Sequence, residues 1–255
     1  MQADRLLFLN KLDYDLRVVW RARREEESTV PLGGLKQGFF LSFEGIEGCG
    51  KTSQLHRLAR SLRALGYQVV ETREPGGAPI SEQIRTILLD PKNRGMDARC
   101  ELLLYVASRA QHVAETIRPA LEKGAVVLCD RFADATMAYQ GYGRRLGPAV
   151  VASLNHVATA GLVPDLAILL DVPVSVGLGR KRRAGGLDRL DREQASFHEA
   201  VRRGYLRLAR QNPRRVRVVD GTASEEAVAL AIDRIVQPWL RARRPALTRV
   251  EPHAV

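Results

Sequence analysis

The sequence contains little cysteine, with three residues in 255 and no C-x-x-C spacing. An odd number of cysteines without that spacing argues against a disulfide framework, and the five histidines, scattered singly, give no zinc-site spacing. No apolar run approaches the roughly 20 residues needed to span a bilayer, and no small-residue cleavage site follows the short apolar patch near the N-terminus. We therefore expect a cytoplasmic protein with no membrane among its partners.

Positive charge is in excess, with 40 Lys and Arg against 29 Asp and Glu and a formal net charge of +11. Such an excess suits any polyanion, whether nucleic acid, acidic lipid or nucleotide phosphates. Residues 202–217 hold seven arginines and no acid, but Tyr205 is their only aromatic residue. Proteins that bind single-stranded nucleic acid combine basic residues with several aromatic side chains on which the bases stack. We therefore interpret this segment as a solvent-exposed face and expect no nucleic-acid partner.

Short β-branched runs alternate with helical periods through most of the chain, which is typical of a parallel sheet with crossover helices. The predicted strands are 39–43, 68–72, 125–129, 165–170 and 216–219. In the long helix predicted over 101–123, we assign the buried stripe to Leu103, Val106, Ala110, Val113, Ile117 and Leu121. We expect three parts: a non-catalytic N-terminal extension (1–37), one α/β domain (38–240) and a disordered tail (241–255).

The strongest motif spans residues 45–52 and reads G-I-E-G-C-G-K-T, matching G-x-x-x-x-G-K-[ST] at every fixed position. A hydrophobic strand precedes it and an amphipathic helix follows, as a phosphate-binding loop requires. Its glycines let backbone N–H groups close around phosphate oxygens, its lysine neutralises the β- and γ-phosphates, and its threonine hydroxyl can bind Mg²⁺. We therefore assign ATP binding to Gly45, Ile46, Glu47, Gly48, Cys49, Gly50, Lys51 and Thr52.

Polar side chains follow two more predicted strands at the edge where ligands bind in parallel sheets. Asp130 and Arg131 follow the run AVVLC, and Arg73 and Glu74 follow the second strand. An acid at this edge can organise Mg²⁺, so we predict that Asp130 and Thr52 of the loop form the metal site. The planar guanidinium groups of Arg73 and Arg131 can each donate two hydrogen bonds to a phosphate.

Two further segments carry candidate ligand groups. In the long helix, Tyr105, Arg109 and His112 share a face outside the predicted apolar stripe, and an aromatic one turn from an arginine can stack on a base and donate to its carbonyl. Residues 180–192 combine a Gly-Gly pair with a cationic run. That combination fits a mobile lid that brings arginines over the phosphates, although a solvated helix is the alternative.

Taken together, FEGIEGCGKT, TREPGG, LLLYVASR, CDRFADATMAYQGYGR and GLDRLDRE followed by FHE resemble bacterial thymidylate kinases in order and spacing. The resemblance covers roughly residues 38–237. It implies a P-loop nucleoside-monophosphate-kinase fold with a five-stranded parallel sheet flanked by helices and a small lid. It also implies transfer of the γ-phosphate of ATP–Mg²⁺ to dTMP, in dTTP biosynthesis, by a homodimer.

The resemblance also implies roles for individual residues. The residues that it implies for dTMP binding are Glu47, Arg73, Glu74, Arg85, Tyr105, Arg109, Arg131, Thr136, Tyr139 and Gln140. Tyr105 stands where the family has a stacking Phe, Arg109 would donate to thymine O4, and Thr136 and Gln140 would complete recognition of the base. The implied catalytic residues are Lys51, Arg131, Arg183 and Arg189. Some relatives carry an arginine inside the P-loop, so Gly48 at that position shifts the expected charge to the lid arginines, which also include Arg180 and Arg182.

Two alternatives stay open at this point. One is another P-loop nucleoside-monophosphate kinase, although a purine acceptor would need a site of different shape. The other is a P-loop protein that binds nucleic acid through its basic surface and has no kinase activity.

Overall fold

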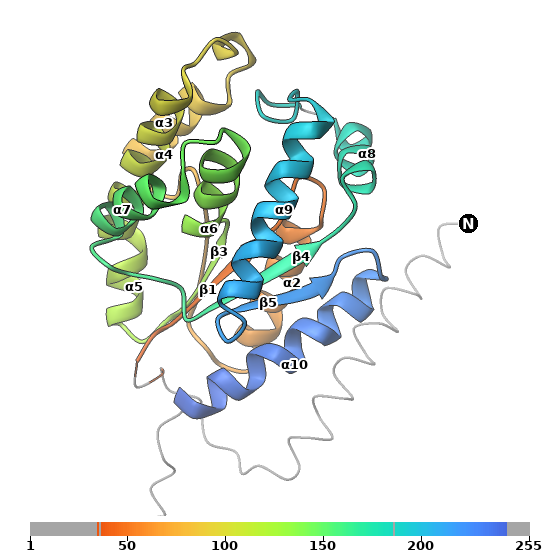
Figure 1. Cartoon of the computed structure of the whole chain (residues 1–255). Coiled ribbons are helices and arrows are strands. Elements are labelled where there is room, and N and C mark those ends of the chain that lie inside the picture. Colours follow the sequence, from red (N-terminus) through yellow and green to blue (C-terminus); the bar gives the residue numbers. More distant parts are fainter. Residues whose placement is uncertain (1–34, 36, 186, 244–255) are drawn as a thin grey trace, which may run out of the picture. The chain divides into compact units, whose positions relative to one another are not determined.

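The structure is a computed structural model that describes residues 35, 37–185 and 187–243. Its centre is a five-stranded sheet in the order β2-β3-β1-β4-β5, with every neighbouring pair parallel (Figure 1). The strands are β1 (Phe39–Glu44), β2 (Val69–Arg73), β3 (Val126–Asp130), β4 (Leu166–Asp171) and β5 (Val216–Asp220). All five agree with the predicted strands to within a residue or two, so the predicted parallel sheet is confirmed.

Helices connect the strands and cover the sheet (Figure 1). The helices before β3 are α2 (Lys51–Ala64), α3 (Pro79–Leu89), η1 (Pro91–Asn93), α4 (Ala98–His112), η2 (Val113–Ile117) and α5 (Arg118–Glu122). Those after it are α6 (Ala133–Thr136), η3 (Met137–Gly143), α7 (Pro148–Thr159), α8 (Val174–Ala184), α9 (Ala195–Gln211) and α10 (Glu225–Arg243). Both η2 and η3 are π-helical, a widened form that is frequent at functional sites.

The two faces of β1 pack against different helices because successive side chains of a strand point to opposite sides. Phe39 stacks on Trp239 of α10, and Leu55, Leu58 and Leu62 of α2 are buried. On the other face, Phe40 meets Phe132 edge-on with 4.9 Å between ring centroids, in a cluster that includes Val113 and Ile117 of η2. This burial on both faces explains why β1 reads as a nearly continuous apolar run, with Ser42 as the polar residue between Leu41 and Phe43.

The predicted apolar stripe of the long helix is wrong in its first part. Leu103 is 55 % exposed, and Val106 is only half-buried, whereas Val113 and Ile117 are buried as predicted. The buried face of α4 instead carries Glu101, Leu102, Ser108, Arg109 and His112. Hydrophobic periodicity chose the wrong face because this helix buries polar groups that bond to other elements.

The ends of the predicted domain shift slightly. Helix α10 extends to Arg243, three residues into the predicted tail, and Arg243 pairs with Asp165 at 2.6 Å. Leu35, from the predicted extension, is buried, and its N–H donates to the carbonyl of Gly124. The remaining residues of the predicted extension and tail lie outside the described residues, apart from residue 37.

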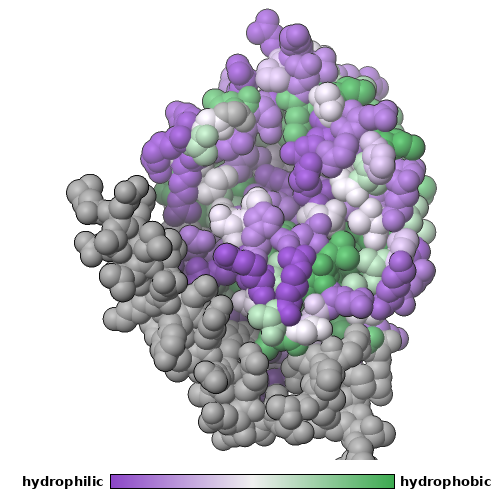
Figure 2. Space-filling model, turned by 180° about the vertical axis from the view of Figure 1, so that it is seen from behind, coloured by the Kyte–Doolittle hydropathy of each residue, from purple (hydrophilic) through white to green (hydrophobic). Residues whose placement is uncertain are grey.

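Figure 2 shows a mostly hydrophilic surface on the side opposite to the view of Figure 1, with small hydrophobic patches between charged residues. Within the part of the chain that the structure describes, none of the helices has both the length and the apolar character needed to cross a bilayer.

Candidate active site

The P-loop connects β1 to α2 and holds three glycines with positive φ, at Gly45, Gly48 and Gly50. A Cβ atom at Gly48 would lie 2.1 Å from the carbonyl oxygen of Gly177 in α8, so the close approach of α8 excludes any side chain there. Lys51 is buried, and its ammonium donates to the carbonyls of Gly45 (3.1 Å) and Ile46 (2.9 Å). The loop therefore has the shape of a phosphate cradle, and it cannot supply an arginine from position 48.

The two residues predicted to hold the metal meet in the structure although 78 positions separate them in the chain. The register of the sheet aligns Asp130 of β3 with Phe43 of β1 and with Arg73 of β2, so all three strands end at one edge. The Thr52 hydroxyl donates to Asp130 Oδ2 at 2.6 Å. A hydroxyl and a carboxylate are ligands that Mg²⁺ accepts, and Mg²⁺ in phosphoryl-transfer sites takes its other ligands from water and phosphate oxygens.

Glu47 forms the centre of a buried polar cluster beside the P-loop. Its carboxylate accepts hydrogen bonds from Arg131 Nη2 at 3.1 Å and from the Tyr139 hydroxyl. His198 Nδ1 of α9 lies 3.1 Å from the other carboxylate oxygen, an ion-pair distance without hydrogen-bond geometry. Burial would raise the pKa of Glu47, but the His198 ring, the charge of Arg131 and the Tyr139 hydroxyl together hold it well below its usual range. Glu47 is therefore ionised.

Arg131 has a backbone φ of 72°, a conformation that costs non-glycine residues about 1–3 kcal/mol and is concentrated at functional sites. The next N–H, of Phe132, donates to Oε1 of the buried carboxyl group of Glu44 at 2.9 Å. The Arg131 guanidinium donates to the carbonyl of Gly45 at 3.1 Å and to the Tyr205 hydroxyl at 3.3 Å. These contacts fix Arg131 between the P-loop and the Glu47 cluster.

Arg109 and Glu74 form a buried ion pair, with 1 % and 3 % of their side chains exposed and 2.7 Å between Nη2 and Oε2. Arg109 also donates to Asn155 Oδ1 at 2.7 Å and to the carbonyl of Phe132 at 3.1 Å. His112 completes the group at 3.0 Å from Glu74 Oε1. Most of the donors of Arg109 are thus committed to protein acceptors, although its side chain also borders the cavity described next.

A cavity of about 720 Å³ runs from the P-loop to the η3 helix. Lys51, Thr52, Asp130 and Arg131 line one part of it. The predicted acceptor residues also line it: Glu47, Arg73, Glu74, Arg85, Tyr105, Arg109, Thr136, Tyr139 and Gln140. One cavity therefore holds both predicted nucleotide sites.

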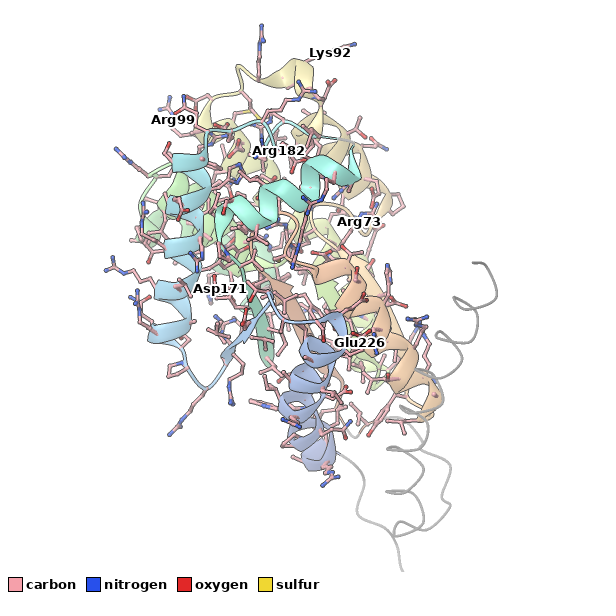
Figure 3. The ribbon with its side chains drawn as sticks, turned by 90° about the vertical axis from the view of Figure 1, so that its right-hand side faces the viewer. Arg73, Lys92, Arg99, Asp171, Arg182 and Glu226 are labelled. Atoms are coloured by element: carbon pink, nitrogen blue, oxygen red, sulfur yellow. The ribbon has the colours of Figure 1, made fainter. Side chains whose placement is uncertain are left out.

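Two acceptor-site arginines lie at the cavity margin. Arg73 is exposed and pairs with Glu82 at 3.0 Å. Arg85 donates to the carbonyl of Pro75 at 2.7 Å, and its pKa is lowered by burial and by the charge of Arg73. Figure 3 views the domain from the right-hand side of Figure 1 and labels Arg73 there.

The base end of the cavity contains polar groups on neighbouring turns. Thr136 is 1 % exposed, and its hydroxyl has no hydrogen-bond partner in the described structure. Gln140, four residues later, donates from Nε2 to Glu101 at 2.8 Å. Tyr105 borders the same space, and burial raises the pKa of its hydroxyl, so that group stays protonated. A buried hydroxyl without a partner at a cavity wall is what a polar ligand would satisfy.

The predicted lid arginines separate into two groups. Arg180 lines the cavity together with Lys181, Asp188, Leu190 and Asp191. The other predicted lid arginines do not line it: Arg182 (Figure 3) and Arg183 are exposed on α8, and Arg189 is buried. Arg189 pairs with Glu101 at 2.6 Å and donates from Nε to the carbonyl of Leu88 at 2.8 Å. The structure brings together the predicted residues of both nucleotide sites, but it does not bring Arg183 or Arg189 to the cavity wall.

Sequence reasoning missed several residues that build the site. Glu101, His198 and Glu44 are fully buried, and each contacts a predicted site residue or the residue next to one. Glu44 directly precedes the P-loop, and Glu101 lies one helical turn before Tyr105 on the same face, so both could have been suggested by position. His198 had no such signal beyond the FHE segment.

The comparisons with known proteins agree with this geometry. Residues 43–232 match the model of the thymidylate kinase family. The chain is 55 % identical over 201 residues to the thymidylate kinase of Geobacter sulfurreducens, covering 76 % of this chain and 94 % of that protein. It is 48 % identical over 211 residues to that of Desulfovibrio desulfuricans, covering 80 % and 97 %.

A solved structure gives the same result. The crystal structure of thymidylate kinase from Ehrlichia chaffeensis superposes with a TM-score of 0.65 at 33 % identity, covering 79 % of this chain and 99 % of that one. The family model matches most of the chain, and the relatives are matched over nearly their whole length. The chain therefore belongs to the thymidylate kinase family, and its reaction is the ATP-dependent phosphorylation of dTMP to dTDP.

Proposed function

We propose that ATP binds along Gly45–Thr52 with Mg²⁺ held by Thr52 and Asp130. The 2.6 Å contact between the Thr52 hydroxyl and the Asp130 carboxylate supports this assignment, because it gathers two oxygen ligands beside the phosphate cradle. When bound, the metal would neutralise charge on the β- and γ-phosphates. Lys51 would move its ammonium from the loop carbonyls to phosphate oxygens.

The acceptor dTMP would occupy the part of the same cavity beyond Arg131. Tyr105 would stack on thymine, while Thr136, Gln140 and Arg109 would hydrogen-bond its edge. The unpartnered hydroxyl of Thr136 carries this proposal, because a buried hydroxyl at a cavity wall requires a partner. Glu47 and Tyr139 would face the sugar. The acceptor phosphate would lie near Arg73, Arg85 and Arg131, with Glu74 holding Arg109 in place.

Transfer itself would depend on position and charge. Phosphoryl transfer demands little covalent chemistry from the protein, and a dTMP phosphate is already largely ionised near neutral pH. Arg131 is fixed by Glu47, Gly45 and Tyr205, which suits it to bridge the donor and acceptor phosphates without reorganising. No general base is required.

The lid would supply the charge that the P-loop lacks at Gly48. Arg180 and Lys181 already border the cavity, whereas Arg183 and Arg189 would have to move toward the phosphates to act catalytically. Single alanine variants at the four lid arginines test these roles by kcat, namely Arg180, Arg182, Arg183 and Arg189. We expect a loss at the arginine that contacts the phosphates, and turnover near wild type in all four variants would exclude a catalytic lid arginine.

We also propose a cytoplasmic homodimer. Helices α3, α4 and α7 pack side by side on one side of the domain (Figure 1). They carry exposed apolar side chains, namely Ile80, Ile87, Leu103, Val150 and Val157. Exposed apolar residues gathered on one side are typical of an interface, and a second copy of this chain is the occupant that we propose.

A coupled ADP-release assay tests the acceptor and donor assignments. With ATP and Mg²⁺, we expect strong preference for dTMP and dUMP over CMP, GMP and AMP. Equal activity on all five would overturn the thymine-site assignment, and undiminished activity without divalent cations would overturn the metal site. Removal of residues 1–36 should leave kcat/KM unchanged, since we propose a non-catalytic role for the segment 1–37.

A further inference from the structure

A buried carboxylate on α4 contacts three different elements around the base end of the cavity. Glu101 is fully buried, and its Oε1 accepts from Gln140 Nε2 at 2.8 Å. Arg144 spans both carboxylate oxygens, with Nε 3.1 Å from Oε1 and Nη2 3.0 Å from Oε2. Arg189 Nη1 lies 2.6 Å from Oε2. Two guanidinium groups and one amide therefore share this carboxylate.

The charge state of Glu101 follows from these partners. Burial alone would raise the pKa of its carboxyl, but the hydrogen bonds from Arg144 and Gln140 and the charge of Arg189 lower it overall. An ionised carboxylate can only accept hydrogen bonds. The amide of Gln140 must therefore turn its NH₂ group toward Glu101, and its carbonyl oxygen is the end turned away.

This orientation matters because Gln140 borders the cavity. A glutamine amide can present either a donor or an acceptor, and only its surroundings decide which. The neighbouring Thr136 hydroxyl can donate or accept, so it does not discriminate between bases. With its NH₂ committed to Glu101, Gln140 offers an acceptor that matches the N3–H of thymine or uracil. Cytosine has an acceptor at N3, so two acceptors would face each other.

We propose that Glu101 is a positioning residue that makes the site selective for bases with an N3–H donor by fixing the Gln140 amide. The proposal rests on the assignment of Gln140 to base recognition above. A site built around a substrate N–H can reject an analogue that lacks it by about 10⁴-fold, because buried polar groups are then left unpaired. Glu101 thus acts through Gln140 without touching the substrate.

Glu101→Gln tests the proposal because it keeps the shape and removes the charge. Arg144 Nη2 and Arg189 Nη1 would hold the new side-chain carbonyl at the Oε2 position, which leaves an NH₂ group facing Gln140 and removes the acceptor of Arg144 Nε. Gln140 would then turn its own carbonyl toward position 101 and its NH₂ toward the base. We expect the ratio of kcat/KM for dTMP to that for dCMP to fall at least tenfold.

Two control variants separate this role from general damage. Glu193→Gln removes the other carboxylate on Arg144, at 2.6 Å, without touching the Gln140 contact, so the ratio should stay within twofold of wild type. Gln140→Ala should lower the ratio, and adding Glu101→Gln to it should change the ratio no further. If Glu101→Gln lowers both kcat/KM values equally, or leaves the ratio within twofold, the proposal is overturned.

A wild-type measurement keeps the test independent of folding. Binding of 3-methyl-dTMP, which lacks the N3–H, should be at least 100-fold weaker than binding of dTMP, and equal binding would overturn the proposal. If Gln140→Ala itself leaves the ratio unchanged, the base-site assignment fails. If Gln140→Ala lowers the ratio and Glu101→Gln does not, the role of Glu101 alone fails.

Discussion

The buried ion pair between Arg109 and Glu74 provides a quantitative test of the site's architecture. Arg109→Met keeps the length of the side chain and its packing over the Phe132 ring, 5.3 Å from the guanidinium carbon, but removes the charge and its hydrogen bonds. The carboxylate of Glu74 then loses its main partner while only 3 % of it is exposed. Breaking a buried pair in this way costs about 3–5 kcal/mol of unfolding free energy.

For a domain of this size, about 2–4 °C of Tm is lost per kcal/mol, so we expect Tm to fall by roughly 6–20 °C. Thermal and urea unfolding at pH 7 measure the change. Arg99→Ala is the matched control, because Arg99 projects from the surface in an exposed pair with Asp97 (Figure 3), and solvent screens such pairs, so its Tm should stay close to that of the wild type.

A double variant sharpens the test. Glu74→Gln combined with Arg109→Met removes both charges, so the double variant should be less destabilised than the sum of the single variants by about 2 kcal/mol. The reasoning is refuted if Arg109→Met costs no more than Arg99→Ala, or if the two single effects simply add.

Three further predictions concern catalysis, pH and assembly. Lys51→Met should lower kcat by about 100-fold or more while dTMP affinity, measured by calorimetry, stays within a few fold, and a proportional loss of both would contradict its assignment to ATP. Burial and the charge of Asp134 raise the pKa of Glu44 from 4.5 to about 8, so the folded state keeps a proton that the unfolded state releases. The free energy of unfolding should therefore fall as the pH rises from about 4.5 to 8. Glu44→Gln should flatten this slope when unfolding is measured over that pH range. An unchanged slope would show that other groups cause it. Leu103→Glu, at a side chain that is 55 % exposed on α4, should shift the protein from dimer to monomer in analytical ultracentrifugation, and an unaltered dimer would place the interface elsewhere.

Much of the fold and of the phosphate end of the site followed from local pattern. The five strands were predictable because parallel strands buried on both faces read as short apolar runs between helical periods. The P-loop was predictable because its glycines, lysine and threonine stand at fixed spacing within eight residues. The meeting of Thr52 and Asp130 followed from the rule that parallel strands end at one edge.

The tertiary structure decided which polar side chains are buried and what they face. Periodicity placed Leu103 in the core and left Arg109 on the other face of α4, whereas the structure exposes the leucine and buries the arginine against Glu74. The charge run at 180–192 could not show that Arg189 folds back onto Glu101. Arg109 and Glu74 are 35 positions apart in the chain, and Arg189 and Glu101 are 88 positions apart. Local sequence propensity does not indicate partners at such separations. The sheet, the P-loop and the family can be read from the sequence, because each depends on local pattern. Packing between distant segments determines which acids and arginines face the cavity and which are held within the protein.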